Sequence, residues 1–224
     1  MRFSFLKSLL VVFGCLFLFS STPNSAQEAE FVEGQDYLVI QTEIREELEI
    51  EEFEDKIQVT EYFNYKCPHC YRLEPEINVW LESKPDDVEF IREAIPLRNQ
   101  WVPVARAYYV AVELDVVDEI HDLMFSAIWE RNLPMEQEDL IERLFETRAD
   151  VEVELFQETY QSETIRDYMR DARTKMQLYG LQGTPAFVIN DLYVVDTKSA
   201  GETPMFEIID FLIEKIRNER DPDS

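Results

Sequence analysis

The stretch FNYKCPHCYRLEP, residues 63–75, decides the fold, because it places Cys67 and Cys70 where an extended segment changes into a helix. Apolar side chains alternate over residues 57–65, which predicts a strand. Residues 67–83 then predict a helix. The sequence therefore puts a C-x-x-C pair at the N-terminus of a helix that directly follows a strand.

The spacing of the two cysteines favours reversible disulfide chemistry. Residues three apart face one another across a helical turn, within the distance that a disulfide spans. At the helix N-terminus, free N–H groups and the helix dipole favour a Cys67 thiolate, the species that attacks and leaves in exchange. We expect Cys70 to be more buried and to resolve a mixed disulfide formed at Cys67. Pro68 suits the first helical turn, and the His69 imidazole would further stabilise the thiolate.

Three other interpretations of the motif compete. An inert structural disulfide would constrain little chain over so short a loop. Half of a zinc site would need a second C-x-x-C or a nearby histidine pair, and the chain has two histidines in all, so we expect no metal. Haem attachment needs a histidine directly after the second cysteine, where this sequence has Tyr71.

Two further signals lie outside the motif. The segment GTPAF at 183–187 puts a proline at the start of an apolar strand. A cis Thr184–Pro185 bond would turn the Thr184 backbone outward as an open edge, whereas a trans bond would make an ordinary strand-entry proline. Glu61 shares the inner face of the strand before the cysteines; if buried, it would accept a proton from Cys70, and on an edge strand it would be a solvated carboxylate.

The rest of the chain predicts an α/β unit interrupted by helices. The further predicted elements are a strand at 88–91, helices throughout 100–179, a hairpin of 186–189 and 192–195, and a terminal helix opened by Thr203 and Pro204. Within the helical block, Asp150 is expected to cap a helix that begins at Val151.

Composition and charge exclude several classes of protein. Hydrophobic residues make up 46% of the 224 residues, which is enough for a core and argues against disorder. The chain has 47 Asp and Glu against 21 Lys and Arg, a formal net charge of −26, which disfavours binding to nucleic acid or an anionic membrane. Residues 42–56 hold many of these acids and predict a solvated lead-in segment, with an acidic docking arm as the alternative.

Residues 1–26 have the organisation of a secretory signal, with basic residues, an apolar run at 9–19 and then a polar stretch. The apolar run has 11 residues, well short of the ~20 that span a bilayer as a helix. Cleavage is expected after Ala26, and a retained N-terminal anchor is the alternative. Export would bring the remaining cysteines to a compartment where disulfides form and persist.

These features together resemble the DsbA family of exported thiol:disulfide oxidoreductases. The resemblance is carried by FNYKCPHCYRLEP at 63–75 and GTPAFVIN at 183–190, with a helical block between them. It implies an α/β, thioredoxin-like domain formed by residues 27–98 and 180–224, with an inserted all-helical domain at 99–179.

The resemblance also implies roles for single residues. Cys67 is similar to the family's exposed nucleophile and Cys70 to its buried partner, with Pro68 and His69 as the dipeptide between them. Glu61 matches the family's buried acid. The substrate-binding residues implied are Pro185, similar to the family's cis-proline beside the disulfide, and Thr184, whose backbone would meet the substrate chain.

The function that we expect is a monomeric, periplasmic dithiol oxidase with no cofactor beyond its Cys67–Cys70 disulfide. It would donate this disulfide to newly exported, unfolded polypeptides, and the family's partner DsbB, a quinone-linked membrane protein, would reoxidise it. A disulfide isomerase or reductase of the same fold is one alternative. A non-catalytic, peptide-binding chaperone is another.

Overall fold

The structure, a computed structural model, describes residues 31–48, 56–201 and 204–221. The predicted secretory signal at 1–26 lies outside these residues, as do Thr203 and part of the acidic segment, residues 49–55. Among the helices that are described, none combines the length and the apolar character needed to cross a membrane.

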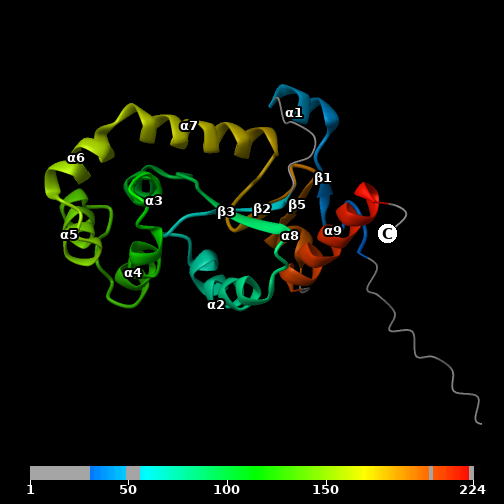
Figure 1. Cartoon of the computed structure of the whole chain (residues 1–224), viewed down its shortest axis with the longest axis horizontal. Helices are drawn as coiled ribbons and strands as arrows, with labels where there is room; N and C mark the ends of the chain where they lie inside the picture. Colours follow the sequence, from blue (N-terminus) through cyan, green and yellow to red (C-terminus); the bar gives the residue numbers. More distant parts are fainter. Residues whose placement is uncertain (1–30, 49–55, 202–203, 222–224) are drawn as a thin grey trace, which may run out of the picture. The chain divides into compact units, whose positions relative to one another are not determined.

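A five-stranded sheet forms the centre of the fold, with the strand order β1-β5-β4-β2-β3 (Figure 1). Its strands are β1 (Leu38–Val39), β2 (Ile57–Phe63), β3 (Val88–Ala94), β4 (Ala186–Ile189) and β5 (Tyr193–Asp196). β2 pairs in parallel with β3 and antiparallel with β4, so it has neighbours on both edges. The four predicted strands are confirmed, although β2 ends two residues early. β1 was not predicted, because a strand of two residues is too short to show an alternating pattern.

The hairpin of β4 and β5 turns at Asn190 and Asp191, whose φ angles are 51° and 53°. Asn and Asp are the residues that best tolerate this left-handed conformation after glycine, which is why the turn was predictable. The register pairs Ala186 with Tyr62. The chain that enters β4 therefore passes the end of β2, where the C-x-x-C motif follows.

Helices cover both faces of the sheet. On one face lie α2 (Pro68–Ser83) and α9 (Met205–Arg220), which meet where Trp80 stacks on Phe206 with ring centroids 5.1 Å apart. The predicted apolar face of the terminal helix is buried here. The other face is covered by α1 (Thr42–Glu47) and the end of α7 (Glu163–Leu178), through Ile44 and Met176. α1 was not predicted, but its acids point into solvent as expected of this segment.

The predicted helical block lies between β3 and β4 in the chain (Figure 1). It consists of a 3₁₀ turn (Asn99–Trp101) and the helices α3 (Val102–Glu113), α4 (Val117–Trp129), α5 (Glu138–Ala149), α6 (Val153–Gln161) and α7 (Glu163–Leu178). A short helix, α8 (Thr197–Ala200), follows β5 and is capped by the Asp196 side chain. A thioredoxin-like sheet with a helical insertion is therefore confirmed as the fold class.

The expectation that Asp150 caps a helix beginning at Val151 is wrong. Asp150 instead ends α5 in a left-handed conformation with φ 53°, and Glu152 precedes α6. The Val151 N–H group bonds back to the Phe145 carbonyl, so these residues close one helix rather than open the next. Aspartate suits both positions, because it accepts N–H bonds at an N-terminus and tolerates positive φ.

One continuous core joins the sheet to the inserted helices. Tyr62 of β2 and both cysteines belong to the same buried cluster as Phe145 and Phe156 of the helical block. The described residues from Phe31 onward form one compact unit. A division into domains at 98/99 and 179/180 stays a prediction. In the described residues, the segments on either side of these boundaries share one buried core.

The core of the helical block supplies a test of this packing. Replacing fully buried Phe156 with alanine should lower the free energy of unfolding by about 3–5 kcal/mol, because it removes a ring that packs 5.0 Å from Phe145 and leaves a cavity. The matched control is Leu155→Ala on the same helix, whose side chain is 46% exposed. Urea unfolding measures both, and equal losses for the two variants would contradict the packing described here.

Candidate active site

The two cysteines lie at the junction between β2 and α2. Cys67 is the N-cap residue of α2 and Pro68 its first residue, as predicted. The turn before them is held by Asn64, which sequence analysis missed. Its side chain is fully buried, donates to the Ile95 carbonyl at 3.0 Å and accepts the Lys66 N–H at 2.9 Å. These bonds fix the path of the chain into the helix and hence the position of Cys67.

Hydrogen-bond donors surround the Cys67 sulfur. The pKa of Cys67 is lowered from 9 to about 6, first because the Cys70 thiol donates to this sulfur and further because the backbone N–H groups of Cys70 and His69 do so, against the opposing effect of burial. The N–H of Cys70 lies 3.4 Å from Sγ. Near neutral pH the Cys67 side chain is therefore mostly a thiolate.

Cys67 is more enclosed than an exposed nucleophile, since only 2% of its surface is accessible. Its Sγ lies 3.2 Å from the carbonyl oxygen of Thr184, to which the protonated thiol donates. The Thr184–Pro185 bond is cis. The two motifs quoted from the sequence thus meet at one sulfur atom, and Thr184 is one of the residues that cover Cys67.

Cys70 has the opposite electrostatic environment. It is fully buried, and the pKa of its thiol is raised far above the usual range by desolvation, by its hydrogen bond to Cys67 and by the charge of Glu61. Both cysteines are free thiols in this structure. One sulfur of the pair is thus stabilised as an anion and the other as a neutral thiol.

Glu61 is fully buried on β2, beneath α2. Burial raises the pKa of its carboxyl to about 8, although the guanidinium of Arg92, 3.0 Å away, acts in the opposite direction. Glu74 and Cys67 add negative charge that raises this pKa further. The alternative of a solvated carboxylate on an edge strand is therefore wrong, because β2 lies inside the sheet and α2 covers it.

His69 differs from the other predicted site residues, because its side chain is exposed. Its Nδ1 accepts a hydrogen bond from the Arg72 guanidinium at 3.0 Å, while its backbone N–H is the part that acts on Cys67. A direct effect of the imidazole on the thiolate stays a prediction.

Besides Asn64, three polar residues near Glu61 were missed, of which Glu74 and His121 are buried and Arg92 is largely buried. Arg92 on β3 reaches Glu61 and, at 3.2 Å, Glu74 on α2. His121 on α4 lies 3.3 Å from Glu74. The signals were an arginine directly after the predicted strand at 88–91 and a single histidine on an apolar helix face. Neither signal indicates which residue is the ion-pair partner, because each partner comes from a different element.

Metal binding was not expected from the sequence. The described residues include Glu74, His121 and Asp122, whose potential ligand atoms lie within 4.8 Å of one another. The Arg92 guanidinium already bonds the Glu74 carboxylate, and a second cation beside it would be repelled. We therefore describe this cluster as part of an ion-pair network.

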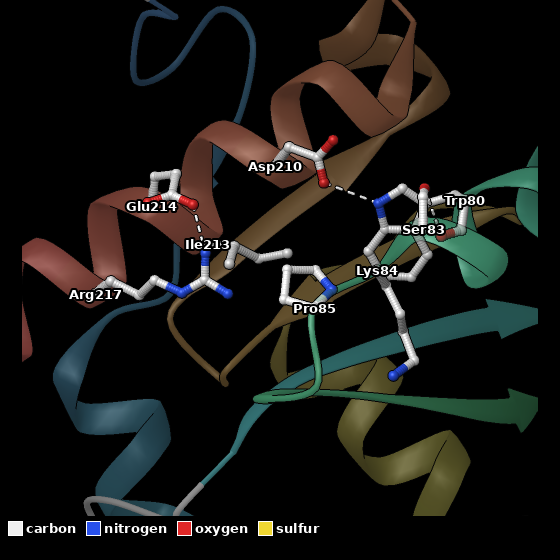
Figure 2. Close-up of a pocket in the computed structure, with 8 residues that line it drawn as sticks. All are labelled: Trp80, Ser83, Lys84, Pro85, Asp210, Ile213, Glu214 and Arg217. Carbon is white, nitrogen blue, oxygen red and sulfur yellow. Dashed lines mark hydrogen bonds and ion pairs between the residues drawn. The ribbon is translucent and has the colours of Figure 1, made fainter.

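A pocket of about 270 Å³ lies between the end of α2 and α9 (Figure 2). Trp80 Nε1 donates to Asp210 at 2.8 Å on one side of it, and Glu214 pairs with Arg217 on the other (Figure 2). Trp80 is thirteen residues from Cys67 along α2, or about 20 Å of helix. The pocket is thus remote from the cysteines, and none of the predicted site residues lines it.

The thioredoxin-like fold and a cysteine pair of opposite protonation at a helix N-terminus define a thiol:disulfide oxidoreductase. Residues 58–208 match the family described as DSBA-like thioredoxin domain, and the chain belongs to this family. It is 33% identical over 167 residues to the thiol:disulfide interchange protein DsbA of Pseudomonas aeruginosa, which covers 72% of this chain and 77% of that protein.

Other relatives agree with this assignment. DsbA of Pseudomonas syringae is 28% identical over 210 residues, covering 93% of this chain and 95% of its own. The crystal structure of Pseudomonas aeruginosa DsbA superposes with a TM-score of 0.73 at 28% identity, covering 85% of this chain and 96% of that one. That of the oxidoreductase DsbA from Xylella fastidiosa gives 0.71 at 27% identity, covering 83% and 97%.

The charge state of Cys67 can be measured directly. Thiolate absorbance of the reduced protein in the ultraviolet should titrate with a midpoint near pH 6, and Cys67→Ser should abolish this transition. Cys70→Ala should move the midpoint upward, because it removes the thiol that donates to the Cys67 sulfur. A midpoint near 9, as for a free cysteine, would contradict the site described here.

Proposed function

We propose that this protein is a dithiol oxidase, which donates its Cys67–Cys70 disulfide to newly exported, unfolded polypeptides. The observation that carries the proposal is the stabilised Cys67 thiolate. A thiol with a pKa of about 6 is about tenfold stabilised at pH 7 relative to one of pKa 9. This favours the reduced form by ~1.4 kcal/mol and makes the disulfide more oxidising by ~30 mV.

The transfer proceeds in two exchange steps. A substrate thiolate attacks Cys67, the Cys67–Cys70 bond breaks, and the Cys70 sulfur leaves with the electron pair and takes a proton. A second substrate thiolate then attacks the substrate sulfur of the mixed disulfide, and Cys67 leaves as a stabilised thiolate. The substrate gains one disulfide, and the enzyme becomes the dithiol.

Glu61 would move the proton that Cys70 requires. Its raised pKa, about 8, leaves it protonated near neutral pH, so it can supply the proton when Cys70 leaves as a thiolate. In reoxidation the direction reverses, and Glu61 accepts the proton of the buried thiol. The charge interaction between Glu61 and both cysteines supports this role.

The substrate chain would bind beside the cis peptide bond. The Thr184 carbonyl lies 3.2 Å from the Cys67 sulfur, so an extended chain that bonds to the Thr184 backbone would bring its own cysteine to Cys67. Thr184 and Pro185 are thus the substrate-binding residues of the proposal. Backbone bonding suits an oxidase of unfolded chains, since it does not depend on substrate side chains.

We further propose that the enzyme acts in the periplasm as a monomer and that a DsbB-like, quinone-linked membrane protein reoxidises it. The leader at 1–26 has the organisation of a secretory signal, and the curated relatives are named thiol:disulfide interchange protein DsbA. A formal net charge of −26 makes nucleic acid an unsuitable partner.

A glutathione redox titration tests the direction of transfer. The potential should lie above thioredoxin's, about −270 mV, because the reduced form is stabilised. A value as low as thioredoxin's would favour a reductase. With a reduced, unfolded substrate protein, the oxidised enzyme should form disulfides stoichiometrically, and Cys67→Ser should form none. If Cys67→Ser instead kept the full effect on substrate refolding, a peptide-binding chaperone would replace the oxidase.

A further inference from the structure

Four polar side chains from four elements, three of them buried and Arg92 largely buried, form one chain of contacts beneath the cysteines. Glu61 of β2 bonds Arg92 of β3 at 3.0 Å, and Arg92 bonds Glu74 of α2 at 3.2 Å. Glu74 Oε1 lies 3.3 Å from His121 Nε2 on α4, in the inserted block (Figure 1). The chain therefore runs from the acid nearest the cysteines to a helix of the insertion.

The charges of this network do not balance without a proton. It holds two carboxylates and one guanidinium, all largely buried, so ionising both acids would leave a net negative charge out of water. Two carboxylates that share one cation in this way also share one proton. Whichever acid holds that proton is neutral, and the other remains paired with Arg92.

The protonation of His121 follows from its neighbours. A carboxylate only accepts, so the Nε2 that faces Glu74 must carry hydrogen. In the neutral ring, Nδ1 is then an acceptor, and the Tyr65 hydroxyl, 3.1 Å away, donates to it. Burial lowers the pKa of His121, which favours the neutral ring. In the described residues, Nε2 and Glu74 Oε1 are both buried without an aligned hydrogen-bond partner, and the 3.3 Å contact between them is the polar contact available to each.

We propose that His121 is a positioning residue that, by donating Nε2–H to Glu74, keeps Glu74 ionised and thereby keeps the shared proton on Glu61, next to the cysteines. The inference deepens the proposed function, because it rests on Glu61 as the group that moves the Cys70 proton. It assigns to the inserted helices a part in the chemistry of the thioredoxin-like sheet.

The titratable groups around His121 are few in the described part of the chain. They are Glu74 on α2, Arg92 on β3, the hydroxyl of Tyr65 after β2 and exposed Asp122 on α4 itself. The rings of Phe63 and Phe125 pack against the imidazole with centroids 5.5 and 5.3 Å away. Glu74 is thus the acid on which loss of the imidazole acts most directly.

Removal of the His121 N–H donor should change the pKa of Cys67 in a definite direction. Without the His121 N–H, the anionic form of Glu74 loses a charge-assisted hydrogen bond, and the shared proton moves toward Glu74 by about tenfold in population. Glu61 then carries more negative charge beside the cysteines. Because Glu61 and Cys67 interact through their charges, the Cys67 thiolate becomes harder to form.

The test compares His121→Phe with His121→Gln in the reduced protein. Phenylalanine fills the space without a donor, whereas glutamine restores an N–H near the Nε2 position. The ultraviolet midpoint of Cys67 should rise in His121→Phe and stay near the wild-type value in His121→Gln. The infrared band of a protonated buried carboxyl, assigned to Glu61 by its loss in Glu61→Gln, should weaken at pH 7 only in His121→Phe.

Phe125→Leu is the matched control, because it disturbs the same aromatic cluster without touching the network's protons. It should lower stability and leave the Cys67 midpoint unchanged. Equal midpoints in wild type and His121→Phe, or an equal rise in Phe125→Leu, would overturn the inference. If His121→Phe does not fold, Glu74→Gln replaces it: the midpoint should rise, and adding His121→Gln should cause no further change.

The design separates this inference from the proposed function. If the Glu61 band and the Cys67 midpoint move in His121→Phe while the rate of substrate oxidation by Glu61→Gln equals the wild-type rate, His121 positions the proton but Glu61 does not serve catalysis. If Glu61→Gln slows oxidation and His121→Phe moves neither the band nor the midpoint, Glu61 serves catalysis and the inference about His121 fails.

Discussion

The rest of the site depends on one interaction, in which the negatively charged Cys67 sulfur accepts hydrogen bonds from donors in the first turn of α2. The Cys70 thiol and the N–H groups of Cys70 and His69 point at this atom because Cys67 caps α2. Asn64 holds the turn that delivers the chain to that position, and Thr184 closes over the sulfur from the other side. The sheet places these segments together, since the start of β4 is in register with the end of β2.

The same arrangement gives the two thiols different charge states. Cys67 is stabilised as an anion at the helix N-terminus, whereas Cys70, one turn deeper, is desolvated and lies near an acid. Glu61 holds its proton close to neutral pH because it too is buried and because Arg92, its ion-pair partner, also pairs with Glu74. A pair of groups with separated protonation states, rather than two similar thiols, is what directional disulfide exchange requires.

The sequence predicted those parts of the structure that local patterns determine. Cys67 and Pro68 at a helix start, the Asn190–Asp191 turn and the apolar face of α9 are each set by neighbouring residues, and each was predicted. The partners of Glu61 were not, because Arg92 reaches it through the register of two parallel strands and Glu74 through a helix crossing above. His121 and the contact of Cys67 with the Thr184 carbonyl likewise depend on segments far apart in the chain. Burial of Cys67 was missed for the same reason.

The central claim is that ionisation of Cys67 makes the reduced protein the more stable form. A depressed pKa in the folded state contributes stability that is present at high pH and is lost as pH falls through the folded pKa, here about 6. The most direct measurement is the free energy of unfolding of the reduced and the oxidised protein at several pH values. The reduced form should be the more stable at pH 7, with an advantage that grows toward pH 9, shrinks as pH falls toward 6 and is lost below it. An oxidised form that is more stable at pH 7, or a difference that does not change with pH, would contradict the account.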